Sequence, residues 1–462
     1  MENKRSTGVI IVGAGLTGLT AAWYLKSKGC DVVVLEKNSR PGGVIQTFSE
    51  DGFIYEAGPN TGVLSHPEAA ELFEDLAGRC RLETADARAK RRLIWKSGRW
   101  HALPNGLLSA VKTPLFNTRD KLRILGEPFR RKGQDPFESV AGLVKRRLGK
   151  SYLDFAVDPF ISGIYAGDPE KLVTRYALPK LYALEQNYGS FIRGAVRKML
   201  ETADERQKKA TREVFSAGGG LASLTAALAD GIGSDRILLN SENVKVKSAK
   251  SGFIADFMVD GRSCGLEAPF VVSTVDSMYV PGLFPFIDGW EISKLSSLEY
   301  AAVTQVIMGY RKWRGMSLNA FGGLVPSVER RDVLGILFPS SFLKNRAPDG
   351  GALLSVFIGG YRRRELAEAD DDRIRTLVYN EVVQMLGLEH PVPDIFRIFR
   401  YPRAIPQYFR SSKERLEAID RIEARYSGLI LAGAIRDGIG MADRIRQAKA
   451  IAGRIAEKLT KL

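Results

Sequence analysis

The start of the chain carries three glycines with the spacing of a phosphate-binding turn: Gly13, Gly15 and Gly18. In the pattern GxGxxG the first glycine permits a tight turn, the second lets a pyrophosphate approach the main chain, and the third lets a helix pack closely on the sheet. The N-terminus of the following helix, at Leu16 and Thr17, presents free N–H groups and a partial positive charge to phosphates. The pattern therefore predicts a dinucleotide site.

The residues around this turn have the pattern of a strand, a helix and a second strand. An apolar, β-branched run at residues 9–12 precedes the turn, and a second buried strand at residues 32–35 ends on Glu36. A carboxylate at this strand end is placed to accept hydrogen bonds from a ribose and should reject a 2′-phosphate. Two other interpretations stay open because residues 8–25 are uncharged and follow two basic residues: a targeting segment or membrane anchor, and a strand-helix-strand unit without a ligand.

Two more glycine-rich turns follow the acidic strand end. The first contains the doublet Gly42-Gly43, and the second contains Gly58-Pro59. A loop with paired glycines lets the main chain lie against a flat or charged ligand, where a Cβ would clash. Each motif alone is equally consistent with an ordinary turn between strands.

A further glycine-rich turn lies far away, near the C-terminus. It contains Gly433, Gly438 and Gly440, follows an apolar strand pattern at residues 429–432, and precedes a long helical pattern. Nucleotide binding at one strand-helix-strand unit does not explain a second turn of this kind. A long ligand does, if its far end is a flavin ring resting on this helix N-terminus, where the dipole stabilises negative charge on the reduced ring. We therefore expect the two ends of the chain to meet around one coenzyme.

Composition sets the class of protein. The chain has 462 residues, of which 45% are hydrophobic, and this length is enough for two or three domains with substantial cores. The three cysteines, Cys30, Cys80 and Cys264, form no CxxC pair, which favours a reducing compartment. The histidines are too few and too scattered for a metal cluster, so we expect no metal and ordinary surface or packing roles for His66, His101 and His390.

The excess of positive charge is concentrated in one segment. The formal net charge is +15, and the segment from Arg88 to Lys150 holds seventeen basic residues and four acidic ones. Apolar residues at helical spacing predict that residues 85–210 are mainly helical. A basic amphipathic region without a long apolar run can lie on an anionic membrane surface. A solvated charged face is the second interpretation, and nucleic-acid binding, disfavoured by the scarcity of interleaved aromatic residues, is the third.

The remaining chain alternates between strand and helix patterns. Strand patterns occupy residues 237–274 and 300–361, and a helical pattern covers residues 373–386. The strands at 237–274 follow a glycine turn and helix at residues 215–228, which returns the chain to a strand-helix arrangement like that of the N-terminus. The nucleotide domain is therefore expected to be assembled from distant segments.

Together these motifs resemble the flavin-containing amine oxidase superfamily. Within it, three middle segments are similar to oxygen-dependent protoporphyrinogen oxidases and their coproporphyrinogen-oxidising relatives: DPFISGIYAGDP at 158–169, LEQNYGS at 184–190 and RAIPQY at 403–408. The similarity covers nearly the whole chain, and these motifs are more specific than the glycine pattern.

The resemblance implies an α/β fold with three parts. A Rossmann-like FAD-binding domain of the p-hydroxybenzoate hydroxylase type is expected over residues 1–86, 212–276 and 410–462. A helical membrane-binding domain is expected over residues 87–211, and a mixed-sheet substrate-binding domain over residues 277–409. The implied reaction is the six-electron oxidation of a porphyrinogen, with three transfers of hydride to FAD and reoxidation by O2 to give H2O2.

The resemblance also implies site residues. FAD is expected to bind noncovalently, because no cysteine follows Cys264, and to contact Gly13, Ala14, Gly15, Leu16, Thr17, Gly18, Glu36, Lys37, Gly42, Gly43, Val44, Gly58, Pro59, Asn60, Thr61, Val244, Gly433, Gly438, Ile439, Gly440 and Met441. Arg91 falls where protoporphyrinogen enzymes carry an arginine for a propionate, with Arg92 as the nearby alternative. Leu318, Leu334 and Phe357 would contact the macrocycle, although core packing explains them equally well.

The implied function is oxidation of protoporphyrinogen IX, with coproporphyrinogen III oxidation as the alternative. A flavin amine oxidase is disfavoured because a basic substrate would meet a very basic protein. A non-catalytic Rab-escort-like or GDP-dissociation-inhibitor-like binding protein shares the fold, but the complete phosphate and flavin loops argue against it.

The expected partners follow from this function: a porphyrinogen, O2, an anionic membrane surface, a second copy of the chain, and the next haem-pathway enzyme as receiver of the product, with no nucleic acid. We expect a cytoplasmic protein bound peripherally to a membrane, without a signal peptide or transmembrane helix.

Overall fold

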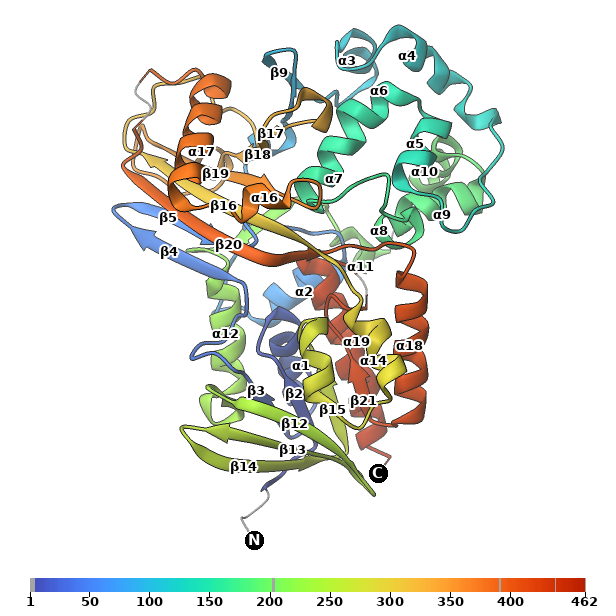
Figure 1. The fold of residues 1–462 in the computed structure, drawn as a ribbon, viewed down its shortest axis with the longest axis vertical. Helices are drawn as coiled ribbons and strands as arrows, with labels where there is room; N and C mark the ends of the chain where they lie inside the picture. The colour runs from blue at the N-terminus through green and yellow to red at the C-terminus, as the bar shows by residue number, and fades with distance from the viewer. Residues whose placement is uncertain (1–4, 202–203, 390–391, 437, 462) are drawn as a thin grey trace.

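The computed structural model describes residues 5–201, 204–389, 392–436 and 438–461. In Figure 1 a half that holds both ends of the chain, built on a parallel sheet, lies below a mixed sheet and a group of helices. The mixed sheet occupies the upper left and the helices α3 to α10 occupy the upper right. The structure therefore has the α/β composition that the sequence predicts.

The lower half is built on a five-stranded sheet in which every pair is parallel. Its strands are fully or largely buried apolar runs, as expected for a parallel sheet covered on both faces. Their order is β11 (Ile237–Leu238), β3 (Val32–Leu35), β2 (Val9–Val12), β15 (Phe270–Ser273) and β21 (Leu429–Leu431).

Helices and a small sheet cover the two faces of this sheet. One face packs on α1 (Leu16–Ser27), α12 (Ala222–Ile232) and α19 (Met441–Leu459). The other face packs on strands β12 (Glu242–Ala249), β13 (Gly252–Val259) and β14 (Arg262–Ala268), to which β1 (Arg5–Ser6) adds an edge, and on α18 (Ser412–Arg425). Segments from the start, the middle and the end of the chain thus share one core.

The seven-stranded sheet is mixed, as predicted: β17 and β8 run parallel, and the other neighbours run antiparallel. Its order is β20 (Ile395–Pro406), β16 (Tyr300–Tyr310), β19 (Ala352–Gly359), β18 (Val333–Leu337), β17 (Gly322–Leu324), β8 (Arg92–Lys96) and β9 (Arg99–Ala102). Helix α17 (Asp371–Leu386) packs on one face, which we call the outer face. We call the opposite face the inner face.

The prediction that the segment from residue 85 onward is mainly helical is wrong for residues 92–102. These residues form the hairpin β8–β9, which extends the seven-stranded sheet. Ser97 and Gly98 both have positive φ, at 51° and 79°, as a tight two-residue hairpin turn requires. The Ser-Gly pair was the available signal, but the dense basic residues around it suggested a charged helical face.

The remainder of this region is helical. It contains α3 (Leu107–Lys112), α4 (Thr118–Leu125), η2 (Glu127–Phe129), α5 (Val140–Arg147), α6 (Lys150–Tyr152), a π-helical turn (Leu153–Val157), α7 (Asp158–Ile164), α8 (Thr174–Ala177), α9 (Pro179–Tyr188), α10 (Phe191–Leu200) and α11 (Glu205–Lys208).

Not all of the basic excess of this region is on the surface. Arg147 is fully buried and pairs with Glu127, at 3.0 Å, and with Glu185, at 2.5 Å. Glu127 also accepts hydrogen bonds from the backbone N–H groups of Phe191 and Ile192, at the start of α10. Removing one partner of such a network leaves an uncompensated buried charge. The network therefore joins α5, α9 and α10 and fixes where α10 begins.

Shorter elements complete the fold. They are the hairpin β4 (Gln46–Glu50) and β5 (Phe53–Ala57); the strands β6 (Gly62–Val63), β7 (Leu82–Thr84) and β10 (Val214–Ala217) of a small sheet; and α2 (Pro67–Asp75), η1 (Ala87–Lys90), η4 (Ser234–Arg236), η5 (Ser277–Tyr279), α13 (Val280–Leu283), α14 (Gly289–Ser296), η6 (Ser327–Glu329), α15 (Pro339–Phe342) and α16 (Arg364–Ala367).

Candidate functional site

The first and last glycine turns meet at one residue, Thr274. Strand β15 lies between β2 and β21, and Val12, Ser273 and Leu431 are aligned at the ends of the three strands. The Thr274 hydroxyl donates to the carbonyl oxygens of Val12 and Gly13, 3.1 Å from each. A Cβ at Gly433 would lie 3.2 Å from the carbonyl oxygen of Thr274. The structure thus brings together the two turns that the sequence expects to hold one ligand.

Two helices start from these turns and point their N-termini to the same edge of the sheet. Helices α1 and α19 follow the parallel strands β2 and β21 and pack in one core. Their N-caps, Gly15 and Gly440, have no side chain to accept a hydrogen bond, and α1 has no acidic residue in its first turn. Two sets of backbone donors and two positive dipole ends therefore converge, an arrangement suited to an extended anionic ligand.

The fit of the glycines to a dinucleotide can be tested residue by residue. A Cβ at Gly18 would lie 1.9 Å from the carbonyl oxygen of Gly13, so the fold itself requires Gly18. A Cβ at Gly15 would meet no atom within 4 Å, so the folded chain does not require glycine there. Val44, beside this turn, is 66% exposed. The residues present therefore fit FAD, because the turn has room for a pyrophosphate where a side chain would intrude.

Glu36 lies at the end of β3, as predicted, and is 5% exposed. Its Oε2 accepts a hydrogen bond from the N–H of Ala14, at 2.8 Å, and its Oε1 accepts from the N–H and side-chain amide of Asn38, at 2.9 and 2.7 Å. A carboxylate can accept about four hydrogen bonds. Glu36 therefore orients the phosphate turn and retains acceptor capacity for a ribose.

Two other predicted cofactor residues lie near this strand end. The Lys37 ammonium lies 4.2 Å from the centre of the Tyr279 ring and donates to its hydroxyl, at 3.1 Å. Val244, in β12, packs against the core on the far side of the parallel sheet.

Arg40 holds the second glycine turn, and sequence reasoning did not single it out. Its guanidinium donates to the carbonyl oxygens of Pro41, Gly43 and Ile45 at 2.8 to 3.2 Å. Burial lowers the pKa of Arg40, which the nearby charge of Glu36 partly opposes. A Cβ at Gly43 would lie 3.1 Å from the Cα of Gly15, so this turn rests on the phosphate turn. An arginine directly before Pro-Gly-Gly was the available signal.

Gln305 joins the third glycine turn to the seven-stranded sheet, and no sequence signal marked this glutamine within an apolar strand. Its side chain is fully buried. Its Oε1 accepts a hydrogen bond from the N–H of Gly58, at 3.0 Å, while its Nε2 donates to the carbonyl oxygen of Glu56 and to Ser355, both at 2.9 Å. The turn that contains Pro59, Asn60 and Thr61 is therefore fastened to the inner face of the sheet.

The inner face carries two of the predicted substrate residues, Leu334 and Phe357. The strand register places Leu324 and Ile94 on the same face. Phe357 is aligned across the strands with Gly335, Leu324 and Ile94. Residues aligned in this way share a face, since side chains alternate along a strand. Leu334 and Phe357 pack on the same small core. Leu324 contacts α7, where a Cβ at Gly163 would lie 2.4 Å from its Cδ2.

The pairing of β8 with β17 gives Arg92 and Arg91 different positions relative to the inner face. Arg92 lies two residues before Ile94 in β8 and therefore shares the inner face with Phe357, whereas Arg91 precedes the strand and ends η1. Although the Arg92 side chain as a whole is exposed, its guanidinium lies 5.6 Å from the centre of the Phe321 ring, and burial lowers its pKa. The structure favours Arg92 as the inner-face cation.

Leu318 does not join this group. It packs with Trp100 and Met316 against the core that the sheet shares with α17. This is the outer face, opposite to Phe357, so the expectation that Leu318 and Phe357 meet one macrocycle does not fit the structure. Leu324, six residues later, occupies the inner-face position instead.

Side chains of Tyr408 and Gln447 hold the C-terminal glycine turn through hydrogen bonds to its main chain. The hydroxyl of Tyr408 lies 3.0 Å from the carbonyl oxygens of both Ala434 and Gly438. The N–H of Gly433 donates to the side chain of Gln447, at 2.7 Å. Ile439 packs against the core behind the parallel sheet, and Met441 is buried against the core on its other face. The glycine turn is thereby fixed before α19 begins.

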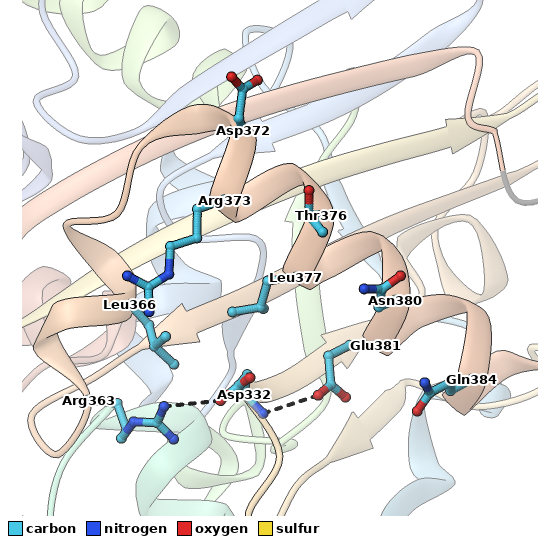
Figure 2. A pocket seen from close by; sticks show the side chains of 10 residues that line it. All are labelled: Asp332, Arg363, Leu366, Asp372, Arg373, Thr376, Leu377, Asn380, Glu381 and Gln384. Atoms are coloured by element: carbon cyan, nitrogen blue, oxygen red, sulfur yellow. Dashed lines mark hydrogen bonds and ion pairs between the residues drawn. The ribbon is translucent and has the colours of Figure 1, made fainter.

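A hollow of about 520 Å³ lies on the outer face, along α17 (Figure 2). It is lined mainly by charged and amide side chains, several of which satisfy one another. Arg363 donates to Asp332 at 3.1 Å, and Glu381 accepts from the N–H of Asp332 at 3.3 Å. The hollow lies away from the glycine turns and has no part in the site described above.

Comparison with known proteins agrees with this arrangement. The profile of the family described as flavin containing amine oxidoreductase matches residues 16–456. The chain belongs to this family. It is accordingly a flavoprotein oxidoreductase with FAD as its cofactor. The match begins at Leu16, in the first glycine turn, and includes the whole of the last one.

Several relatives carry more specific names. The mitochondrial protoporphyrinogen oxidase of Nicotiana tabacum is 30% identical, over 95% of this chain and 93% of its own length. The coproporphyrinogen III oxidase of Bacillus subtilis is 24% identical, over 96% of each chain. The crystal structure of an Exiguobacterium protein, titled as a candidate protoporphyrinogen oxidase, has a TM-score of 0.80 at 23% identity, covering 99% of this chain and all of its own.

No cluster of metal-binding side chains occurs among the described residues. His390 lies outside them. His101 lies in β9, and burial lowers its pKa, an effect to which Arg99 adds. The Nε2 atom of His66 lies 2.9 Å from Oδ1 of Asp443.

The environment of Gly15 leads to a prediction about cofactor binding. Gly15→Ala should leave the thermal unfolding of the flavin-free protein within about 1 °C, because the new Cβ has open space, yet lower FAD affinity by roughly tenfold or more, because that Cβ enters the pyrophosphate path. Flavin titration followed by fluorescence quenching measures the affinity. Gly453→Ala, at another open position in α19, is the matched control and should leave flavin binding unchanged. Equal FAD affinity in the two variants would contradict the assignment.

Proposed function

We propose that this flavoprotein oxidises a porphyrinogen to a porphyrin, with protoporphyrinogen IX as substrate and O2 as electron acceptor. The observation that carries the proposal is the inner face of the seven-stranded sheet. It presents apolar side chains and a cation on one surface, and Gln305 fastens that surface to the glycine turn at Gly58. An apolar ring with carboxylate arms matches this combination.

The protein groups on this face bind and orient the substrate. FAD supplies the acceptor for the three two-electron steps that convert a porphyrinogen to a porphyrin. Leu324, Leu334 and Phe357 provide an apolar surface for the macrocycle, and α7 covers Leu324. Correct orientation of the reacting carbon and exclusion of water are the main requirements of hydride transfer, so no nucleophile or metal is needed.

Helix α7 is held against this surface by an ion pair whose acidic partner is buried. Asp158, at its start, accepts hydrogen bonds from the N–H of Ser327 and from Arg362, both at 2.7 Å. Arg362 also donates to Asp168, at 3.0 Å. Both acidic residues belong to the middle motif that resembles porphyrinogen oxidases. The motif therefore serves to place α7 over the inner face.

Arg92 provides the charge for a propionate arm. Arg92 lies three strands away from Phe357, roughly 14 Å across the sheet at the usual spacing between strands, and two residues further along its strand. A large ring that contacts Phe357 extends a carboxylate arm toward this guanidinium. A guanidinium stays charged even when partly buried and pairs with a carboxylate through two parallel hydrogen bonds.

The same surface accommodates coproporphyrinogen III, which carries more carboxylate arms, and a relative with that named activity covers 96% of the chain. Protoporphyrinogen IX is preferred because the inner face offers a predominantly apolar surface with Arg92 as its cation.

The decisive experiment is a parallel assay with both porphyrinogens under air, following porphyrin fluorescence and H2O2. We expect oxidation of protoporphyrinogen IX to exceed that of coproporphyrinogen III in kcat/KM, with three H2O2 formed for each porphyrin. The reverse preference would replace the substrate with coproporphyrinogen III. A flavin-loaded protein inert toward both would refute the proposed function.

Substitution of the neighbouring arginines tests the register. Arg92→Ala should raise the KM for the porphyrinogen by about tenfold or more, with a smaller effect on kcat, because a charge-assisted pair to a carboxylate is lost. Arg91→Ala is the matched control, since it removes the same charge one position earlier, and should change KM by less than about twofold. A large KM effect at Arg91 and none at Arg92 would reverse the assignment.

We propose further that the helical region binds an anionic membrane surface. Its outermost helices expose large apolar side chains, which we call the apolar patch: Leu108, Val111, Leu122, Leu125, Phe129, Ile192, Val196, Met199 and Leu200. Several are more than 70% exposed, with Phe129 at 82% and Met199 at 85%. Soluble monomeric proteins rarely expose so many large apolar side chains in one region of the surface.

The elements that carry the patch are in contact with one another, and basic side chains lie beside it. The Lys121 ammonium donates to the carbonyl oxygen of Val111, at 2.7 Å, which joins α4 to α3. The Arg193 guanidinium lies 5.8 Å from the centre of the Phe129 ring, which joins α10 to η2. Exposed basic side chains flank it: Lys112, Arg119, Arg131, Lys132, Arg193, Arg197 and Lys198. In the described part of the chain, no helix has the length and apolar character needed to span a bilayer.

The patch predicts the behaviour of charged substitutions. The double variant Leu125→Asp, Phe129→Asp should lower binding to phosphatidylserine-containing vesicles by roughly tenfold or more, because two apolar side chains no longer enter the bilayer boundary. Flotation with vesicles measures the bound fraction. Trp290→Asp, at a 59% exposed aromatic residue in α14, is the matched control and should bind as the unmodified protein does. Equal flotation of both variants would contradict the proposal.

A further inference from the structure

Strand β15 is followed by a short helical turn, η5 (Ser277–Tyr279). Asp276 caps this turn: its carboxylate accepts a hydrogen bond from the N–H of Met278, and its carbonyl oxygen accepts one from the N–H of Tyr279, both at 3.0 Å. Ser277 is fully buried, whereas Tyr279 is 46% exposed. The turn therefore presents the Tyr279 ring at the surface on a fixed backbone.

The Tyr279 ring meets Lys37, which directly follows Glu36 at the end of β3. The Lys37 ammonium lies 4.2 Å from the centre of the ring and 3.1 Å from the hydroxyl oxygen. Strand β2 lies between β3 and β15, so this contact joins the ends of the two strands that flank the phosphate turn. We call the contact between Lys37 and Tyr279 the bridge. Val280, beside Tyr279, packs in the core on the face of the sheet opposite to α1.

The bridge lies where the adenosine half of a dinucleotide is expected. In a strand-helix-strand unit of this type the pyrophosphate binds at the glycine turn, and the acidic residue at the end of the next strand binds the ribose that carries the adenine. The N–H of Ser241 donates to the carbonyl oxygen of Glu36, at 2.8 Å, which brings the chain that leads into β12 to the same strand end. Lys37, Val244 and Tyr279 thus come from three segments that meet near Glu36.

Arg403 holds η5 from the seven-stranded sheet. Its guanidinium donates to both carboxylate oxygens of Asp276, at 2.7 and 3.0 Å, and lies 4.0 Å from the centre of the Tyr300 ring. A guanidinium that makes a two-point pair and also stacks on an aromatic ring has a defined position. Arg403 lies in β20 and opens the motif RAIPQY at 403–408. One end of this motif is therefore connected to the edge of the parallel sheet.

We propose that Lys37 and Tyr279 cover the adenosine half of FAD, and that Arg403, through Asp276, holds Tyr279 in position to do so. An adenine ring has a flat π surface, which stacks on a tyrosine ring and attracts an ammonium group. Tyr279 is thus a cofactor-binding residue, and Arg403 is a positioning residue. The inference rests on FAD as the cofactor and not on the identity of the oxidised substrate.

The exposure of the bridge separates a role in binding from a role in folding. Lys37 is exposed and Tyr279 is nearly half exposed, and a contact between a cation and a ring contributes little to stability at such a site. Loss of the ring should therefore cost the flavin-free protein little. It should cost the flavin-loaded protein a stacking surface.

The release of FAD tests the role of the ring. Tyr279→Ala should speed release from the flavin-loaded protein by about tenfold or more, because the stacking surface for the adenine is lost. The rise of flavin fluorescence after dilution measures the rate. Tyr279→Phe keeps the ring and should release FAD within about threefold of the unmodified rate. In both variants the melting temperature of the flavin-free protein should change by less than about 1 °C.

Two fragments of the coenzyme separate a local effect from general damage. ADP carries the adenosine half and FMN carries the flavin half, and each is measured as a competitor of FAD binding to the flavin-free protein. In Tyr279→Ala the inhibition constant of ADP should rise by about tenfold, while that of FMN should stay within about twofold. Equal weakening of the two fragments, or no change in either, would overturn the proposal.

The positioning role of Arg403 has its own test. Arg403→Ala should speed FAD release by about fivefold, and Arg403→Lys by less, because lysine keeps the charge but not the two-point pair. In the double variant Arg403→Ala, Tyr279→Ala, release should be no faster than in Tyr279→Ala alone, since Arg403 acts through Tyr279. Effects that multiply in the double variant would contradict this route.

Arg421→Ala is the matched control for Arg403→Ala. Arg421, in α18, donates to both carboxylate oxygens of Glu291, at 2.8 and 3.0 Å, and lies 5.2 Å from the centre of the Trp290 ring. Its substitution removes a similar pair of contacts elsewhere and should leave FAD release unchanged. Equal acceleration in Arg421→Ala and Arg403→Ala would refute the positioning role.

The placement of the coenzyme can be tested apart from the bridge. Weaker FAD binding in Gly15→Ala together with unaltered release in Tyr279→Ala would keep the phosphate turn as the site and refute the bridge alone. A flavoprotein inert toward porphyrinogens still reports every effect described for Tyr279 and Arg403.

Discussion

The parallel pairing of β15 with both β2 and β21 is the constraint on which the site depends. Because parallel strands in a covered sheet end at the same edge, the turns that follow β2 and β21 emerge side by side and share contacts with Thr274. Helices α1 and α19 then start from one place and direct two dipoles to it. A coenzyme held at both ends therefore requires closure of the chain's two ends into one sheet.

A second constraint fixes where chemistry can occur relative to that coenzyme. Gln305 is buried in β16 and satisfies its amide with main-chain groups of the Gly58 turn. A buried amide without these partners would be costly, so the interaction fastens the seven-stranded sheet to the cofactor side in one orientation. The face that carries Phe357 consequently lies on the side of the glycine turns, whereas the face under α17, with its charged hollow, lies on the opposite side (Figure 2).

The basic excess of the chain serves several purposes. Arg147 neutralises buried carboxylates and fixes the start of α10, Arg40 holds the second glycine turn, and Arg92 lies on the inner face. Exposed cations of the helical region border the apolar patch. At the start of α19, His66 pairs with Asp443, next to the last glycine turn. Individual cations thus pair with buried carboxylates, hold a turn or lie on a surface. The net charge of +15 alone predicts none of these roles.

Local sequence patterns predict most of the helices and strands and the class of cofactor. The spacing of Gly13, Gly15 and Gly18 and the apolar runs around them predict the first strand, turn and helix, because local sterics and burial fix such short segments. Which side chains share a surface depends on contacts between segments that are distant in the chain. Strand register, which depends on pairing between distant segments, placed Arg92 and Leu324 on the inner face and Leu318 on the outer face. The main-chain partners of Gln305 and the carboxylate that pairs with His66 are also far away in the chain, and no local pattern could have predicted them.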